Sequence, residues 1–192
     1  MIFGLLRKQS SRPSASVTLA LALAMVWAMV LGLPLQSRGQ ETQDLGLEGR
    51  GLRSGPITTI TGEVIETDTL IGKVILVNAW ATWCGPCVLE MPAFQRVQDD
   101  IGHQDFLVLG ISADKEGPEF VRDFLEELGI RYPVMVGPQN PLGRLASRVR
   151  GLPTSFLLAR DGRVVSRIEG VFEEQALRRA LRALLEEDPP VG

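Results

Sequence analysis

The chain has 192 residues, a formal net charge of −3 and 45% hydrophobic residues. This composition suits a globular protein with one domain of ordinary size. The net negative charge gives no sign of the basic surface that binds nucleic acid. Only two cysteines and one histidine are present, which limits the possible disulfides and metal ligands.

The N-terminal region is first basic and then uncharged. Residues 1–16 contain Arg7, Lys8 and Arg12 without an acidic residue, and residues 17–35 carry no charge. An apolar stretch of this length approaches the roughly 20 residues of a membrane-spanning helix, and its positive flank stays in the cytoplasm. We therefore predict a cytoplasmic tail over 1–16 and a signal anchor over 17–35. A cleaved signal peptide is the alternative, less favoured because a clear Ala-x-Ala site is missing.

A polar segment follows the apolar stretch. Residues 36–56 are rich in Gly, Gln, Glu and Arg, and their few leucines, Leu52 among them, are too sparse to build a core. We predict a poorly ordered linker here and one domain over 57–188. An uncleaved anchor holds this domain on the extracytoplasmic (periplasmic) side of the cytoplasmic membrane, and cleavage would release it into the periplasm.

Strand-like and helix-like stretches alternate through the domain. An apolar run over 73–80 predicts a buried central strand, and a helix should follow from Cys84 to Ile101 with a kink at Pro92. The other expected elements are a hairpin of 57–60 and 63–65, a strand at 106–112, a helix at 118–128, a strand at 133–136, a helix at 142–149, a hairpin of 154–159 and 163–168 around a two-residue Asp161-Gly162 turn, and a helix at 173–187. This order favours a mixed sheet with helices on both faces.

Cys84 and Cys87 are the only cysteines and lie two residues apart. A disulfide between them closes a very small loop and restrains the unfolded chain little, so the pair is suited to electron exchange rather than to stapling the fold. A structural zinc site needs about four N or S ligands, and His103 is the only histidine available. The spacing predicts thiol–disulfide exchange, and a copper site shared with a partner stays open.

Three motifs carry a family resemblance. The segment over 77–87, which ends in Trp-Cys-Gly-Pro-Cys, is followed by Glu90-Met91-Pro92 and later by Gly151-Leu152-Pro153-Thr154. Together they resemble the thioredoxin superfamily and, more narrowly, the membrane-anchored TlpA/ResA-type reductases of cytochrome c maturation, over roughly residues 55–187. The resemblance implies a thioredoxin-like α/β fold: a mixed central sheet flanked by helices, with an N-terminal hairpin and a central strand–helix insertion within 106–136.

The expected catalytic residues are Cys84, Cys87 and Glu90. Cys84 would lie at a helix N-terminus, where the helix dipole favours its thiolate, and would attack the substrate disulfide. Cys87, one turn further, would resolve the mixed disulfide. Glu90 shares a helical face with Cys87 and could take its proton, although a solvated acidic residue is the plainer interpretation. Asn78 stands where cytoplasmic thioredoxins have a buried Asp, so it cannot supply this carboxylate.

The expected substrate-binding residues are Trp83, Gly85, Pro86, Leu152 and Pro153. Trp83 would offer an apolar surface, and Pro86 would stiffen the loop. Gly85-Pro86 is the dipeptide of thioredoxin, a reductant near −270 mV. The resemblance implies that Pro153 is a cis-proline facing the cysteines, which would allow residue 152 to pair with an extended substrate.

Arg148 and Arg150 precede the Pro153 loop. They are interpreted as a solvated face, with an acidic patch on a partner as the alternative. His103 is expected in a loop after the helix, and Trp80 in the packing around the active-site loop.

The sequence therefore predicts a membrane-tethered thiol–disulfide oxidoreductase that reduces protein disulfides outside the cytoplasm and needs no cofactor. The resemblance implies apocytochrome c as substrate and a transmembrane thiol electron donor as partner. A disulfide oxidase or isomerase, and a non-catalytic copper-binding module, are the alternatives. A thiol peroxidase is disfavoured because no Pro-x-x-x-Thr-x-x-Cys pattern precedes Cys84.

Overall fold

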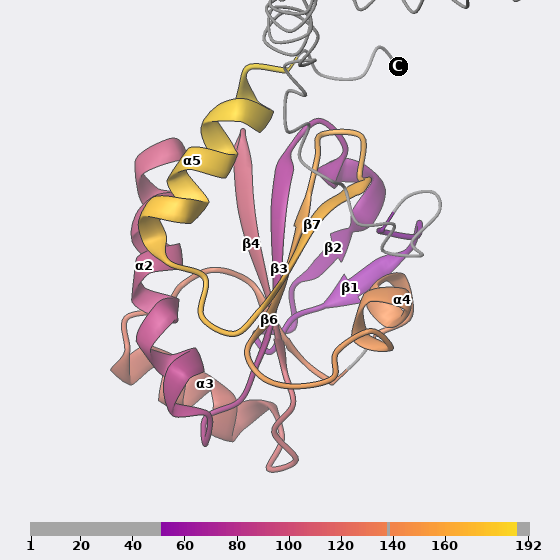
Figure 1. Cartoon of the computed structure of the whole chain (residues 1–192). Helices are drawn as coiled ribbons and strands as arrows, with labels where there is room; N and C mark the ends of the chain where they lie inside the picture. The colour runs from indigo at the N-terminus through magenta and orange to yellow at the C-terminus, as the bar shows by residue number, and fades with distance from the viewer. Residues whose placement is uncertain (1–50, 138, 188–192) are drawn as a thin grey trace, which may run out of the picture. The chain divides into compact units, whose positions relative to one another are not determined.

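The computed structural model describes residues 51–137 and 139–187 (Figure 1). The predicted tail, the anchor and the linker as far as residue 50 lie outside the described residues. Within the described ranges, no helix has the length and apolar character needed to cross a membrane.

Strands and helices alternate along the domain. They are β1 (Pro56–Thr58), β2 (Val64–Glu66), the 3-10 helix η1 (Thr67–Leu70), β3 (Val74–Trp80), α2 (Gly85–Ile101), β4 (Phe106–Ser112), α3 (Pro118–Glu127), β5 (Val134–Val136), the 3-10 helix η2 (Asn140–Leu142), α4 (Gly143–Ala146), β6 (Thr154–Leu158), β7 (Val164–Glu169) and α5 (Glu174–Leu185).

A mixed five-stranded sheet has the strand order β5-β4-β3-β6-β7. Its centre, β3, pairs in parallel with β4 and antiparallel with β6. The strands β1 and β2 form a separate antiparallel pair. The helix α3 and the strand β5 lie within 106–136, where a strand–helix insertion was expected, and β5 extends the sheet beyond β4. The predicted α/β thioredoxin-like fold is confirmed.

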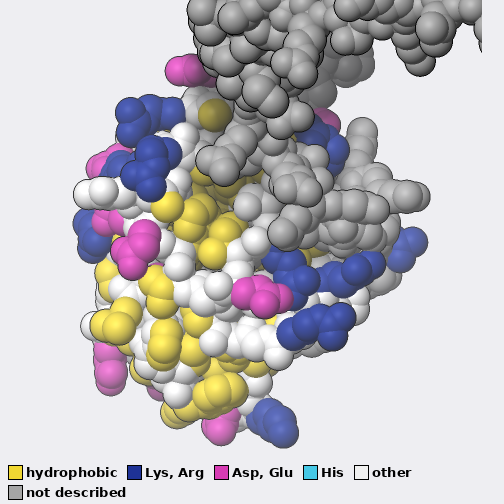
Figure 2. All heavy atoms as spheres, in the orientation of Figure 1, with side chains coloured by type: hydrophobic (Ala, Val, Ile, Leu, Met, Phe, Trp, Pro, Cys, Tyr) yellow, Lys and Arg dark blue, Asp and Glu magenta, His cyan; other side chains and the backbone are white. Residues whose placement is uncertain are grey.

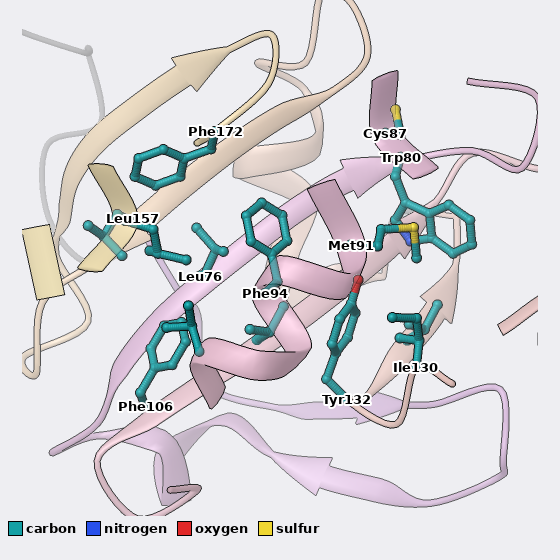
Figure 3. Close-up of a cluster of buried hydrophobic side chains, with 14 of the residues drawn as sticks. Leu76, Trp80, Cys87, Met91, Phe94, Phe106, Ile130, Tyr132, Leu157 and Phe172 are labelled. Atoms are coloured by element: carbon teal, nitrogen blue, oxygen red, sulfur yellow. The ribbon is translucent and has the colours of Figure 1, made fainter. Parts of the chain in front are cut away.

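Two hydrophobic clusters cover the two faces of the sheet, because side chains alternate along each strand. In β3, Leu76 and Trp80 belong to the cluster under α2, α3 and α5. Ile75 and Val77 belong to the opposite cluster, which η1, α4 and β1 help to cover. Figure 1 shows α2 and α5 on one side of the sheet and α4 with β1 on the other, and Figure 3 shows the first cluster.

The helix α2 begins directly after Cys84, which is its N-cap residue, and ends before Gly102, whose φ is 93°. Pro86 lies in the first turn, where its missing amide proton removes no helical hydrogen bond. The kink expected at Pro92 stays a prediction, and α2 continues as one helix through this residue. Pro92 therefore removes one internal hydrogen bond without ending the helix.

Two expectations about the bounds of segments are corrected. Leu52, expected in the linker, is 4% exposed and belongs to the second core cluster, because the Gly51 amide donates to the Gly162 carbonyl and holds the segment on the domain. The helix expected over 142–149 is shorter and ends at Ala146. The chain tightens there into i to i+3 hydrogen bonds, such as that from the Val149 amide to the Ala146 carbonyl.

The turn between β6 and β7 differs from the expected two-residue turn. The Ala159 amide bonds to the Arg163 carbonyl, and the Gly162 amide bonds back to the Ala159 carbonyl, both at 2.9 Å. This pairing encloses residues 160–162, and Gly162 has a φ of 80°. A type I turn followed by a left-handed glycine is a common three-residue hairpin loop, so Gly162 occupies its third position.

Candidate active site

The two cysteines form a disulfide at the start of α2. Their Cα atoms are 5.3 Å apart. Cys84 retains 6% exposure as the N-cap residue, whereas Cys87 lies inside the first turn and is fully buried. Of the two cysteines, Cys84 is therefore the one that keeps some contact with solvent. This agrees with the predicted order of attack by Cys84 and resolution by Cys87, which stays a prediction.

The start of α2 is electrostatically suited to a thiolate. Unpaired amides at a helix N-terminus carry a partial positive charge that favours an anion. The first turn of α2 contains no acidic residue, so no carboxylate within it opposes that charge. A reduced Cys84 therefore lies where its thiolate form is stabilised.

Pro153 has the predicted cis bond to Leu152. Its carbonyl accepts a hydrogen bond from the Gly170 amide at 2.9 Å, which ties the loop to the end of β7. The Thr154 hydroxyl donates to the Gly151 carbonyl at 2.7 Å and closes the loop from within. Leu152 packs against the hydrophobic cluster that contains Cys84 and Cys87. The cis-proline loop and the cysteine pair therefore border the same hydrophobic cluster.

Glu90 is buried in α2, with 3% of the residue exposed. Its Oε1 accepts a hydrogen bond from Asn78 Nδ2 at 2.9 Å, and its Oε2 accepts one from the Phe172 amide at 2.7 Å. Burial raises the pKa of Glu90 to about 7, although both hydrogen bonds oppose this shift. The solvated alternative is therefore wrong, and Glu90 can exchange a proton near neutral pH.

Asn78 connects Glu90 to the sheet. It lies in β3, and its Nδ2 also donates to Ser155 Oγ of β6 at 3.0 Å. The sequence predicted that Asn78 cannot act as the carboxylate but did not predict that it holds Glu90. Phe172 was missed as well, because its partner in sequence is 82 residues away.

Asp114, which the sequence did not single out, holds the segment that enters the disulfide loop. It is 4% exposed and follows β4. Its carboxylate accepts hydrogen bonds from the Thr82 amide at 3.1 and 3.2 Å, from the Thr82 hydroxyl at 2.7 Å, and from the Ser112 hydroxyl at 2.7 Å. The sequence has no local signal for this role, because only the register of β3 and β4, in which Trp80 pairs with Ser112, places Thr82 opposite Asp114.

The other predicted residues lie as follows. Trp83 is 70% exposed beside the cysteines, as expected for a surface that meets partners. Gly85 and Pro86 begin α2, and both are exposed. Trp80 is buried and stacks on Phe124 with ring centroids 6.0 Å apart. Trp80 and Met91, which follows Cys87 by one turn of α2, belong to the same hydrophobic cluster (Figure 3).

The remaining candidates lie apart from this chemistry. His103 is an exposed turn residue after α2. Across 51–137 and 139–187, no group of three or more His, Cys, Asp or Glu residues is placed to hold a metal ion. The fold and the site define a thioredoxin-like protein with a redox-active Cys-x-x-Cys disulfide.

Comparisons with known proteins agree with this class. The model of the Redoxin family matches residues 55–184. Thiol-disulfide oxidoreductase ResA of Bacillus thuringiensis (strain Al Hakam) is 33% identical over 129 residues, which cover 67% of this chain and 73% of ResA. Thiol:disulfide interchange protein HelX of Rhodobacter capsulatus is 30% identical over 154 residues, covering 80% of each chain.

A solved structure gives the same answer for the fold. The crystal structure of a thiol:disulfide interchange protein of the thioredoxin family from Chlorobium tepidum TLS has a TM-score of 0.62 and 30% identity. The match covers 70% of this chain and 94% of that one. The chain therefore belongs to the Redoxin family, and it is a thiol–disulfide oxidoreductase of the ResA type.

Proposed function

We propose that this protein is a membrane-tethered reductase of disulfides in extracytoplasmic proteins, with an apocytochrome c as the leading substrate. The observation that carries the proposal is the Cys84–Cys87 pair at the start of α2, separated by Gly85-Pro86. Thioredoxin, a reductant near −270 mV, carries this dipeptide. The resemblance to the reductases of cytochrome c maturation supports the choice of substrate.

The reaction begins from the reduced dithiol. The Cys84 thiolate attacks one sulfur of the substrate disulfide, a new bond forms between the two proteins, and the other substrate sulfur leaves as a thiolate. Cys87 then attacks Cys84 Sγ, which forms the intramolecular disulfide and expels the second substrate thiolate. Two electrons pass from the protein to the substrate, and both substrate sulfurs end as thiols after protonation.

Glu90 is the base for the second step. Cys87 must lose its proton before it attacks, and it is fully buried on the same face of α2. With a pKa of about 7, Glu90 is ionised in a large share of molecules at neutral pH and can accept that proton. Asn78 and the Phe172 amide each hold one carboxylate oxygen and so fix its orientation.

The location and the electron supply belong to the same proposal. The basic tail and the uncharged stretch over 17–35 support a single-pass anchor with the domain outside the cytoplasmic membrane. The oxidised pair must be reduced again after each turnover. A transmembrane thiol electron donor would supply these two electrons by the reverse exchange.

The test uses the full-length protein and a peptide with an oxidised Cys-x-x-Cys-His motif. We expect the reduced protein to convert the peptide to its dithiol. Cys87→Ser should accumulate a mixed disulfide between Cys84 and the peptide, detected by mass spectrometry, and Cys84→Ser should not. A protein that instead oxidises the reduced peptide faster than it reduces the oxidised one would contradict the proposal and support the oxidase alternative.

A further inference from the structure

A small cavity of about 200 Å³ lies beside the cis-proline loop. It is lined by Arg150, Leu152, Pro153, Thr154, Glu169 and the glycines 151 and 170. Two segments form it: the loop that leads into β6, and the end of β7. The hydrogen bond from the Gly170 amide to the Pro153 carbonyl holds these two segments together.

The charges that face this cavity are unbalanced. Glu169 forms an ion pair with Arg167, two residues earlier on the same face of β7. The Arg167 side chain is only 19% exposed, so its charge is partly withdrawn from water. Arg150 is exposed and has no ion pair within the described part of the chain. The only carboxylate in the lining, that of Glu169, is therefore already paired with Arg167. The positive charge of Arg150 is not neutralised by an ion pair with any described residue.

Basic side chains gather on one side of the domain. Figure 2 shows Lys and Arg side chains gathered on the side of the domain where α4 lies in Figure 1. An acidic side chain appears at the border of this group. A segment that brings a carboxylate to this side of the cis-proline loop would therefore meet a positive potential.

The cavity also lies on the loop that is expected to pair with the substrate. Leu152 lines it and packs against the cluster that contains Cys84 and Cys87. An extended substrate that pairs with the Leu152 backbone would run along the mouth of the cavity. Arg150 and Leu152 line the same cavity, and successive residues of an extended chain are about 3.3 Å apart, so a substrate side chain a few residues from the one that pairs with Leu152 would lie beside Arg150.

We propose that this cavity is a subsite for an acidic side chain of the substrate, with Arg150 as the residue that selects it. The preferred substrates are cysteine-containing extended segments that carry Asp or Glu within about three residues of the attacked cysteine. The proposal rests on the proposed reductase function and adds a charge preference to it. Arg150 acts on binding, not on the sulfur chemistry.

The test uses three disulfide peptides that differ only at one position near the cysteine, which holds Glu, Gln or Lys. The reduced full-length protein should reduce the Glu peptide about two- to five-fold faster than the Gln peptide at low salt, with the Lys peptide slowest. This preference should shrink in about 0.5 M salt, because screening weakens an exposed charge pair. Arg150→Gln should equalise the three rates, and Arg150→Glu should reverse their order.

Each rate is divided by the rate with 2,2′-dithiodipyridine, a small neutral disulfide that reports the reactivity of Cys84 alone. Arg179→Gln is the matched control, because Arg179 is an exposed arginine of α5 away from the cavity, and this variant should keep the wild-type order. Equal rates for the three peptides with the wild type, or an unchanged order in Arg150→Gln, would overturn the subsite while leaving the reductase function intact. Failure to reduce any peptide, with 2,2′-dithiodipyridine still reduced, would overturn the reductase function itself.

Discussion

Glu90 and Asp114 are two buried carboxylates that serve the same disulfide loop in different ways. Each carboxylate oxygen of Glu90, in α2, accepts one hydrogen bond. These bonds lower the pKa of Glu90, but burial raises it by more, to about 7. Asp114, after β4, accepts bonds from an amide and two hydroxyl groups. The comparison separates two roles: Glu90 is proposed to accept the Cys87 proton, and Asp114 holds Thr82 next to the cysteines.

The largest expected effect is on the chemistry of Glu90. We expect Glu90→Gln to slow the resolution of the mixed disulfide by about 10²-fold at pH 8, because an amide cannot accept the Cys87 proton. Below pH 7 the wild-type carboxyl becomes protonated, so the two rates should converge towards pH 5. Stopped-flow measurements of the resolution rate between pH 5 and pH 8 would show this convergence. A Glu90→Gln profile that keeps the wild-type inflection near pH 7 would contradict the role of Glu90.

Stability provides a second readout for the same variant. The pKa of Glu90 is raised in the folded protein, so the folded state holds its proton more tightly than the unfolded state between pH 4.5 and about 7. Stability should therefore fall as pH rises through this window, by about 3 kcal/mol in total. In Glu90→Gln this fall should disappear. Thermal unfolding of the wild type and of Glu90→Gln at pH 5 and pH 8 would measure this fall in stability. An equal fall in the two proteins would show that groups other than Glu90 cause it.

Asp114 is expected to act on structure. Asp114→Ala removes the acceptor of three donor groups and leaves the Thr82 amide without its partner, so we expect a loss of about 2 kcal/mol in the free energy of unfolding. Asp114→Asn keeps one acceptor oxygen and should lose less. Denaturant unfolding would rank the variants. Unlike Glu90→Gln, neither should remove the pH dependence of resolution, and a variant that did so would break the division between the two carboxylates.

The smallest effect is expected at Thr82. Thr82→Ala removes the hydroxyl donor to Asp114 but keeps the amide donor, so the expected loss is about 1 kcal/mol. Thr82→Ser keeps the hydroxyl and should restore most of the stability. Unfolding experiments on both variants would test this, and equal losses in the two would show that the methyl group matters rather than the hydrogen bond.

Much of the fold could be predicted from the sequence, because its central elements have strong local signals. The apolar runs of β3 and β4 and the amphipathic pattern of α5 were identified to within two residues at each end. The segments that were predicted wrongly are those whose structure depends on partners distant in sequence. Leu52 looks like a linker residue until its segment pairs with the β6–β7 loop, and the short α4 has no long periodic pattern.

The candidate site shows the same limit. The cysteine pair and the cis bond at Pro153 follow from short motifs, and the cis bond is confirmed. The hydrogen-bond partners of Glu90 could not be predicted from the sequence. Asn78 and Phe172 lie outside α2 and contact Glu90 only after α2 packs on the sheet. Asp114 resembles an ordinary loop residue in the sequence. Its role appears only when the register of β3 and β4 places it opposite Thr82.

The equilibrium redox potential of the Cys84–Cys87 pair tests the central claim most directly. It would be measured on the full-length protein in glutathione and dithiothreitol buffers, by trapping the thiols at each buffer potential. A reductase should give a value more reducing than about −230 mV, close to thioredoxin near −270 mV. A value near −120 mV, which is typical of disulfide oxidants, would contradict the reductase function.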